Sequence, residues 1–255
     1  MENFEKETIA AIATALSDSG IGIVRISGEN AIYIVDSIFR STSGKKILTK
    51  VQSHTIHYGY IVDKDENIID EVMTSVMKAP KSYTMEDTVE INCHGGVLVM
   101  QKVLETVLQA GARLAEPGEF TKRAFLNGRI DLSRAEAVID VIHSQNEYAL
   151  SSSVSQLKGR LSDKIRSLRE DILYQIAFIE SALDDPEHIS LDGYGERLEL
   201  TIEGAVDRIE KLLASSDNGR ILKEGISTVI VGKPNAGKSS LLNTLLGEEQ
   251  GIELH

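Results

Sequence analysis

The stretch VGKPNAGKSS, residues 231–240, matches the pattern G-x-x-x-x-G-K-[ST] in full through GKPNAGKS. The apolar run KEGISTVIVG before it has the composition of a strand, and KSSLLNTLLG after it has that of a helix start. The glycines of this pattern let backbone N–H groups turn toward phosphate oxygens, and the positive end of the following helix favours the same negative charge. The sequence therefore predicts a phosphate-binding loop between a strand and a helix.

Two side chains of this loop have specific predicted roles. The ammonium group of Lys238 would reach the β- and γ-phosphates of a nucleotide, and the hydroxyl group of Ser239 would bind Mg²⁺. A glycine-rich turn with no ligand is the structural alternative. The predicted nucleotide-binding residues are Gly232, Asn235, Ala236, Gly237, Lys238, Ser239 and Ser240.

The residues after the loop, SLLNTLLGEEQGIELH, contain no second strand with a metal-binding Asp, no switch segment and no base-reading motif. One strand and one helix cannot bury a core of their own. We therefore expect a chain that is truncated within a nucleotide-hydrolysing domain and that does not hydrolyse nucleotide alone. Its catalytic residues for hydrolysis are accordingly unknown.

Composition narrows the class of protein. The chain has 255 residues, of which 42% are hydrophobic and 26% charged, as is typical of soluble globular proteins. Its net charge of −12 argues against broad electrostatic binding to nucleic acid. No apolar run is long enough to span a membrane, and the N-terminus does not resemble a secretory signal. The single cysteine, Cys93, excludes an internal disulfide and favours a cytoplasmic location.

The order of predicted elements divides the chain into three parts. Residues 1–118 alternate strand-like runs with amphipathic helices, which predicts an α+β domain with one sheet and few helices. Residues 119–217 read as helical, and residues 218–255 as a strand, a phosphate-binding loop and a helix start. Apolar residues from Val154 to Leu183 step by three or four, which predicts one long helix. Two or three helices bury such a stripe poorly, so we expect an incomplete bundle.

Charged residues stand at unexpected places in three stretches. Arg25 interrupts the apolar strand IGIVRISG and must find a partner or face a cleft. Polar residues cluster around Gly and Pro in PKSYTMEDTVEINCHGG, residues 80–96, and in EPGEFTKRAFLNGRIDLSRAEAVIDVI, residues 116–142. In the second stretch, Ser133 is predicted to cap a helix with Glu136 in a capping box.

These blocks, together with GKPNAGKSSLLN, resemble the tRNA-modification GTPases of the MnmE (TrmE) family over essentially the whole chain. The resemblance implies an N-terminal domain that binds a tetrahydrofolate derivative, 5-formyl or 5,10-methylene, and forms a homodimer. It also implies a helical bundle that is completed by a C-terminal segment, with a GTPase domain inserted between its halves. Residues 218–255 would then be the start of a Ras-like P-loop G domain. The terminal GEEQGIELH departs from the usual continuation of the family.

The resemblance further implies the function of the whole protein. With a flavoprotein of the MnmG (GidA) family, such an enzyme installs an aminomethyl-type group at carbon 5 of the wobble uridine of certain tRNAs. The folate would supply the one-carbon unit, and GTP hydrolysis would drive rearrangement of the complex. In the family, the position of Asn235 matches a potassium ligand. GTP, magnesium and potassium are thus the expected cofactors besides folate, and tRNA contact is expected through the complex.

A folate pocket needs an acid for the pterin, a cation for the anionic tail and an aromatic wall. On a strand, positions 86 and 90 would share a face. The alternative interpretation is an internal ion-pair network around Arg25 and Arg123. The predicted folate-binding residues are Arg25, Tyr83, Glu86, Glu90, Lys122 and Arg123.

Four other polar residues have structural interpretations. Asn127, Arg129 and Asp131 are predicted to fix the turn into the helical region, and Cys93 to be a packed rather than a nucleophilic cysteine. At the level of the whole protein, the alternative to a folate-dependent enzyme is a nucleotide-gated dimeric scaffold without a catalytic pocket. Folate binding by the N-terminal domain distinguishes the two functions.

Overall fold

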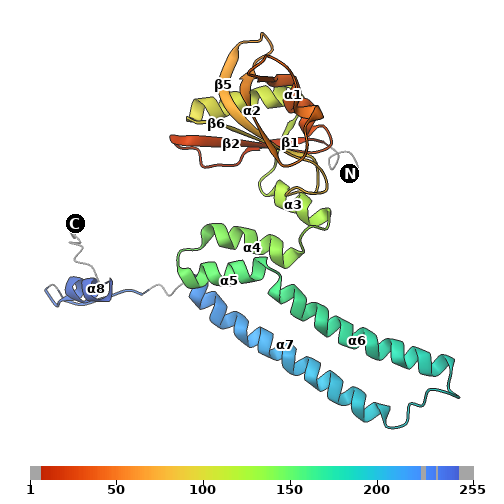
Figure 1. Ribbon diagram of the computed structural model, residues 1–255. Coiled ribbons are helices and arrows are strands. Elements are labelled where there is room, and N and C mark those ends of the chain that lie inside the picture. Colours follow the sequence, from red (N-terminus) through yellow and green to blue (C-terminus); the bar gives the residue numbers. More distant parts are fainter. Residues whose placement is uncertain (1–6, 225–227, 234, 247–255) are drawn as a thin grey trace. The chain divides into compact units, whose positions relative to one another are not determined.

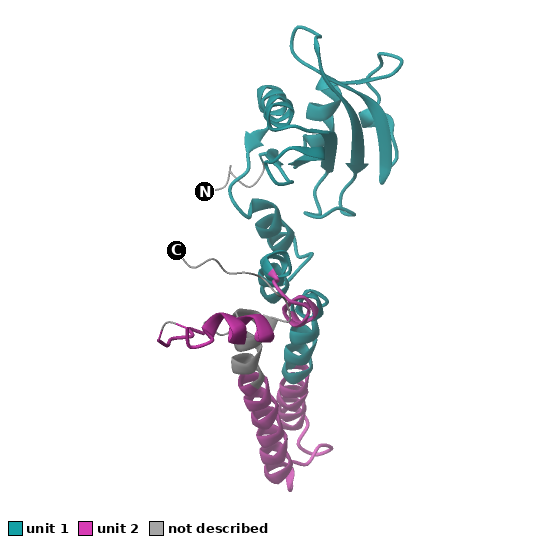
Figure 2. Ribbon diagram, turned by 90° about the vertical axis from the view of Figure 1, so that its left-hand side faces the viewer, with its two compact units in different colours: residues 1–143, 153–169 teal, residues 144–152, 170–255 magenta. Residues whose placement is uncertain are grey.

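The computed structural model describes residues 7–224, 228–233 and 235–246, with the side chains of residues 215–224 and of Leu246 left out. The chain divides into two compact units (Figure 2). One contains residues 1–143 and 153–169, and the other residues 144–152 and 170–255. The terminal stretch GEEQGIELH lies outside the described residues.

The first unit is built on a seven-stranded sheet with the order β3-β4-β5-β6-β2-β1-β7 (Figure 1). Neighbouring strands are antiparallel except β1 and β7, which are parallel. The strands are β1 (Ile9–Ile12), β2 (Ser19–Ser27), β3 (Phe39–Ser41), β4 (Thr55–Val62), β5 (Ile68–Met77), β6 (Thr88–Gly95) and β7 (Arg113–Leu114).

One face of this sheet carries the hydrophobic core. Alternate residues of the central strands point toward the helices α1 (Ala31–Ile38) and α2 (Val97–Gln109), and a 3₁₀ turn, η2 (Leu48–Lys50), packs against α1. This is the period-two burial that a half-covered sheet requires. Fully buried core residues include Val24, Ile26, Val76, Val89, Ile91, Met100, Val103 and Val107.

In the described part of the chain, no helix lies along the opposite face of the sheet, although the Phe120 ring reaches Arg25 at one end of it, 5.6 Å from the guanidinium carbon. The residues of this face alternate with the core residues along each strand, and several apolar ones are about half exposed or more: Ile21, Ile56, Tyr58 and Met73. We call this surface the open sheet face. The prediction of an α+β domain with one sheet and few helices is therefore confirmed.

Two helices, α3 (Glu119–Leu126) and α4 (Leu132–His143), follow the sheet within the first unit. The predicted cap at Ser133 is wrong, because Asp131 holds the start of α4. Its Oδ1 accepts hydrogen bonds from the backbone N–H of Arg134 at 3.0 Å and from the hydroxyl of Ser133 at 3.0 Å. Asp131 precedes the helix and so has the geometry of a capping residue, whereas Ser133 is already helical.

The predicted single helix from Val154 to Leu183 is also wrong, because the chain breaks at Gly159. Helix α5 (Glu147–Leu157) ends before it, and α6 (Arg160–Asp184) begins after it. Gly159 has a φ angle of +92°, which only glycine adopts without strain. The three-to-four spacing of apolar residues continues across this break, so the pattern alone could not show it.

In the second unit, α7 (Tyr194–Glu224) runs beside the later part of α6 (Figure 1). The rings of Phe178 and Tyr194 stack with centroids 4.7 Å apart, and the hydroxyl of Tyr194 donates to the Gln175 side chain at 2.7 Å. Many apolar residues of this pair nevertheless stay exposed, as we expect of an incomplete bundle. They include Ile172, Leu173, Ile176, Leu200, Ile202, Val206, Ile209 and Leu213.

The last described segment contains α8 (Lys238–Leu246), the helix that was predicted after the loop. The strand predicted before the loop is not formed by its described residues, 228–232. A strand needs a neighbour to complete its hydrogen-bond ladder, and no described segment pairs with these residues. Among the described helices, none is both long and apolar enough to cross a membrane.

Candidate functional site

Arg25 and Glu90 form an ion pair on the open sheet face. The register of β2 and β6 places the two residues directly opposite each other. Arg25 Nε lies 2.8 Å from Glu90 Oε1, and the side chains are 27% and 22% exposed. The charge that interrupts the apolar strand thus has its partner on the neighbouring strand, and both groups stay accessible from the open sheet face.

Tyr83 lies next to this pair. The guanidinium carbon of Arg25 is 5.3 Å from the centre of the Tyr83 ring, and that of Arg129 is 4.8 Å from it. These distances are typical of cation–π contacts. The Tyr83 hydroxyl is 2.9 Å from the hydroxyl of Thr121 on α3, which fixes the ring between the sheet and that helix.

Glu86 lies apart from Glu90, contrary to the prediction that the two share a strand face. Strand β6 begins at Thr88, so Glu86 belongs to the preceding loop. Its carboxylate accepts hydrogen bonds from Arg123 Nη1 at 3.2 Å and from the Ser27 hydroxyl at 2.8 Å. Glu86 therefore belongs to an ionic cluster around α3 and not to the Arg25 pair.

Arg123 is 5% exposed and is committed to internal partners. Besides Glu86, its Nη2 donates to Glu119 Oε1 at 3.0 Å and to the backbone carbonyl of Glu7 at 2.8 Å. A cation in this environment is not free to bind the tail of a ligand. Of the two cations predicted for that role, Lys122 is the one that is exposed.

Glu119 is the centre of this cluster and was not singled out from the sequence. Burial raises the pKa of its carboxyl, but the hydrogen bonds from Arg113, from the Glu116 backbone N–H and from Arg123 outweigh burial and lower the pKa to about 2. Arg113 in turn binds Glu7 at 2.8 Å. Glu119 and Arg123 are four residues apart on a helix, and this spacing is the sequence signal that could have revealed their ion pair within the cluster.

A hollow of about 220 Å³ adjoins the ionic cluster, with Lys122 and Asn127 in its lining. The remaining polar lining consists of three carboxylates and two arginines, most of which already pair with one another. Asn127 Nδ2 donates to the Thr84 carbonyl at 2.7 Å and so ties the end of α3 to the loop before β6. The charges of this hollow are thus largely satisfied internally.

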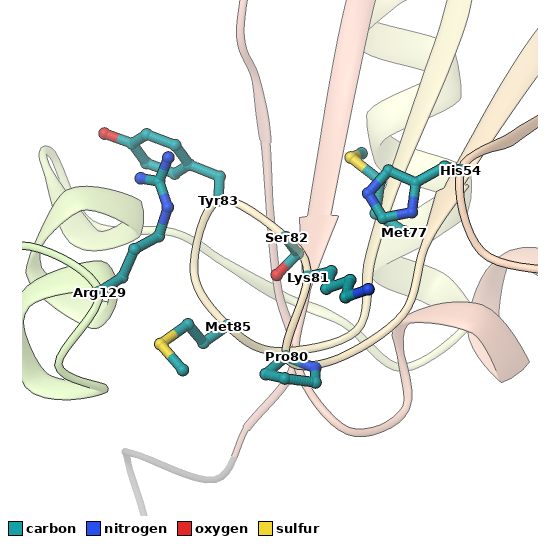
Figure 3. Close-up of a pocket in the computed structure, with 8 residues that line it drawn as sticks. All are labelled: His54, Met77, Pro80, Lys81, Ser82, Tyr83, Met85 and Arg129. Atoms are coloured by element: carbon teal, nitrogen blue, oxygen red, sulfur yellow. The ribbon is translucent and has the colours of Figure 1, made fainter.

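A second hollow, of about 470 Å³, has a different character (Figure 3). The side chains of Lys81, Arg129 and His54 supply its charged and polar nitrogen atoms, and no carboxylate lines it. Its apolar walls are Tyr83, Met77 and Met85, and Pro80 and Ser82 complete the lining. We call it the cationic hollow. Tyr83 thus belongs both to this hollow and to the surroundings of the Arg25–Glu90 pair.

The described residues of the phosphate-type loop turn sharply just before α8. Asn235 and Gly237 have φ angles of +59° and +80°, and α8 begins directly afterwards. The Lys238 ammonium group donates to the carbonyls of Gly232 at 3.2 Å and of Lys233 at 2.9 Å. The first N–H groups of α8 have no acceptor within the helix, which leaves them for an anion.

Comparison with known proteins agrees with these features. Residues 8–129 match the family model described as the GTP-binding protein TrmE N-terminus, and residues 132–253 match the MnmE helical domain. The chain belongs to the MnmE (TrmE) family. It is 61% identical over 246 residues to a protein from Lachnoclostridium phytofermentans that is named tRNA modification GTPase MnmE, and 96% of the chain is covered. A protein of that name from Bacillus subtilis is 51% identical over 248 residues, again covering 96% of the chain.

The chain spans about half the length of these MnmE relatives, 54% in both cases. The fold class is confirmed: a TrmE N-terminal domain, then a helical domain, then the start of a G domain. The two family models meet between residues 129 and 132, at the turn that Asp131 caps. The domain limits at residues 118 and 217 remain predictions.

Cys93 of this MnmE-family chain has the environment of a packed residue. Its thiol is 3% exposed and donates to the Gly22 carbonyl at 3.4 Å. Burial, with the negative charge of Asp70 adding to it, raises the pKa of the thiol to about 11. Because the thiolate is the reactive form, this environment does not suit a nucleophile.

The predicted metal ligands, Ser239 and Asn235, both belong to the phosphate-type loop. Among the described residues, no group of three or more His, Cys, Asp or Glu side chains is placed to hold a metal ion. The Ser239 hydroxyl is a suitable ligand for Mg²⁺, and the Asn235 side chain offers a carbonyl oxygen of the kind that binds K⁺. Both assignments remain predictions, as do the folate-binding residues.

Proposed function

We propose that the chain is part of an enzyme that couples GTP hydrolysis to modification of the wobble uridine of tRNA, using a folate one-carbon unit. Relatives that carry the name tRNA modification GTPase MnmE, at up to 61% identity, support the general activity. The observation that carries the folate assignment is the Arg25–Glu90 pair beside Tyr83 on the open sheet face.

The residues near this pair fit the chemistry of a folate. A carboxylate such as that of Glu90 accepts hydrogen bonds from the pterin amide and amine groups, and the Arg25 guanidinium, 2.8 Å away, holds it ionised and in place. The Tyr83 ring provides a flat wall. When bound, the folate would supply the one-carbon unit, while Glu90, Arg25 and Tyr83 would orient it.

The loop fits a nucleoside triphosphate with Mg²⁺. In this proposal Lys238 leaves the carbonyls of Gly232 and Lys233 to contact β- and γ-phosphate oxygens, and the N–H groups at the start of α8 bind the remaining charge. Ser239 holds magnesium and Asn235 holds potassium. The sequence holds no guanine-reading motif, so we expect this chain alone to show no multiple-turnover GTP hydrolysis and no tRNA modification.

The partners that we propose follow from the family and from the open sheet face. A homodimer through the N-terminal domain would cover apolar residues such as Ile56, Tyr58 and Met73, which are 66%, 52% and 48% exposed. A flavoprotein of the MnmG type would supply the redox chemistry, and tRNA would bind to the complex of the two proteins. We place the protein in the cytoplasm, in keeping with its single, buried cysteine.

Calorimetric titration of the chain with 5-formyltetrahydrofolate tests the folate assignment. We expect micromolar or tighter binding that Glu90→Ala abolishes. Glu66→Ala is the matched control, because Glu66 also pairs with an arginine, Arg40, but in the turn between β4 and β5. If the titration releases and absorbs no heat of binding at any of several temperatures, the result favours the alternative function, a nucleotide-gated dimeric scaffold without a catalytic pocket.

A further inference from the structure

His94 and Asp70 make a contact at the end of β6 that has no part in the proposed folate site. Asp70 Oδ1 lies 2.7 Å from Nδ1 of the His94 ring, and Asp70 Oδ2 accepts a hydrogen bond of 2.7 Å from the His94 backbone N–H. The backbone pairing of β5 with β6 stops at Met73 and Asn92. The Asp70 side chain therefore satisfies a backbone group beyond the last of these pairs. We call this contact the His94 clasp.

His94 occupies a position on the open sheet face, beside the apolar residues of that face. Alternate residues of a strand share a face, and Glu90, Asn92 and His94 are each two positions apart on β6. Met73 is paired directly with Asn92, so its exposed side chain lies diagonally across from His94. The His94 side chain is 67% exposed and that of Asp70 is 10% exposed. The clasp thus presents the imidazole at the surface and keeps the carboxylate largely buried.

The charge at this end of the open sheet face depends on the protonation of His94. Asp70, chiefly through its hydrogen bond, and Glu71, both from β5, raise the pKa of the imidazole above its ordinary value of 6.5. Residues 19–24 of β2 and the first turn of α2 carry no ionisable side chain, and β4 contributes the Tyr58 hydroxyl, which donates to Glu71. Among the described residues, neither carboxylate has a Lys or Arg partner. Two negative charges therefore remain here when His94 is neutral, and one when it is protonated.

We propose that a homodimer through the open sheet face takes up protons at His94, so that the dimer is tighter at mildly acidic pH and weakens as the pH rises. This inference rests on the proposed homodimer and adds its regulation by pH. In a dimer with twofold symmetry, the same surface of each chain meets its copy, so Asp70 and Glu71 of both chains are buried in one interface. Like charges that face each other across an interface oppose association, and the proton on each His94 offsets one of them.

Dimerisation is then linked to proton uptake. The carboxylates of the second copy come near each imidazolium in the proposed dimer, and they raise the pKa of His94 beyond its value in the free chain. Between these two pKa values the dimer binds more protons than two free chains do. The dissociation constant of the dimer, Kd, therefore increases with pH through that window, which begins above pH 6.5 because Asp70 already raises the pKa of His94 in the free chain.

Sedimentation equilibrium of the whole 255-residue chain at pH 6.5 and pH 8.5 tests the proposal. We expect the Kd of the dimer to be about tenfold larger at pH 8.5, since two protons per dimer each contribute about threefold. His94→Gln should give one Kd at both pH values, near that of the unaltered chain at pH 8.5. Glu71→Gln removes a facing carboxylate and leaves the His94 clasp in place, so it should tighten the dimer at pH 8.5 and reduce the ratio.

His188→Gln is the matched control. His188 also pairs with an aspartate, Asp185, at 2.8 Å, but it lies in the loop between α6 and α7 of the second unit. This variant should keep the full ratio of the two dissociation constants. Circular dichroism melts of each variant at both pH values confirm that it is folded, so that a change in Kd reports on association.

The outcomes separate this inference from the homodimer on which it rests. A dimer of the unaltered chain with equal Kd at the two pH values would overturn the role of His94 and leave the homodimer intact. A ratio that survives in His94→Gln, or that disappears in His188→Gln, would also overturn it, because another group would then bind the protons. A chain that stays monomeric at both pH values would contradict the proposed homodimer itself.

Discussion

Arg25 and Glu90 occupy directly paired positions on the antiparallel strands β2 and β6, and their side chains meet at 2.8 Å on the open sheet face. Both side chains are about three-quarters buried, so each needs the other to offset the loss of water. The same two residues therefore stabilise the pairing of β2 with β6 and take part in the folate binding that we propose for the open sheet face.

Removing the carboxylate should destabilise the N-terminal domain. We expect Glu90→Ala to lower the free energy of unfolding by about 1–2 kcal/mol, because Arg25 would keep a largely buried charge without a carboxylate partner. Glu90→Gln should cost less, because it retains a hydrogen-bond acceptor. Urea unfolding followed by circular dichroism measures both. Glu105→Ala is the control, because it breaks the exposed Lys102–Glu105 pair on α2 and should leave the urea midpoint of unfolding unchanged. An equal decrease of the unfolding free energy in Glu90→Ala, Glu90→Gln and Glu105→Ala would contradict this account.

Acid should destabilise the protein through Glu119. The pKa of this carboxyl is lowered from 4.5 to about 2 in the folded chain, so the folded state binds fewer protons than the unfolded state between these values. The stabilisation, about 3 kcal/mol, is fully present above about pH 4.5 and is lost as the pH falls toward 2. Unfolding midpoints between pH 7 and pH 3 test this. In Glu119→Gln the midpoint at neutral pH should be lower and its acid dependence weaker; an unchanged dependence would assign the acid sensitivity to other groups.

The break between α5 and α6 should depend on glycine at position 159. We expect Gly159→Ala to destabilise the protein by about 1–2 kcal/mol, because its φ angle of +92° is strained for any residue with a Cβ. The contact with the Arg134 side chain contributes less, since that side chain can move. Gly204→Ala on α7 is the control: a Cβ there meets nothing within 4 Å and should stabilise the helix by about 0.5–1 kcal/mol. Equal shifts of the thermal unfolding midpoint in Gly159→Ala and Gly204→Ala would refute the requirement for glycine at position 159.

Cys93 should be unreactive in the native protein. Its thiol is buried and its pKa is raised to about 11, so little thiolate forms at pH 8. We expect 5,5′-dithiobis(2-nitrobenzoate) to label the native chain at least about a hundredfold more slowly than the urea-unfolded chain, where one equivalent reacts. Cys93→Ser should leave folate affinity unchanged. Fast labelling of the native chain, at a rate near that of a free thiol, would show that the thiol is accessible.

The sequence predicted the features that depend on local rules. Arg25 inside an apolar strand required a partner, and Glu90, which the structure places opposite it, was among the residues chosen for the same site. The burial of Cys93 and the helix after the loop were also predictable, because short-range composition determines them.

Features that depend on distant contacts or on single dihedral angles were not predictable. The commitment of Arg123 to Glu86 and to the Glu7 carbonyl joins residues 37 and 116 positions apart. The break at Gly159 leaves the apolar spacing intact, so no periodicity could reveal it. The cationic hollow brings together His54, the loop after β5 and Arg129, and only the folded chain shows that no carboxylate lies among them.

Strand β1 is held on its outer side by β7, which pairs Ile9 with Arg113 and Ala10 with Leu114. During synthesis, this first strand must therefore wait for more than a hundred residues before its last neighbour leaves the ribosome. Until then one edge of the growing sheet stays unprotected and can pair wrongly with other chains. Completion of the sheet thus depends on bringing together its earliest strand and its latest one, which are separated by nearly all of the domain's sequence.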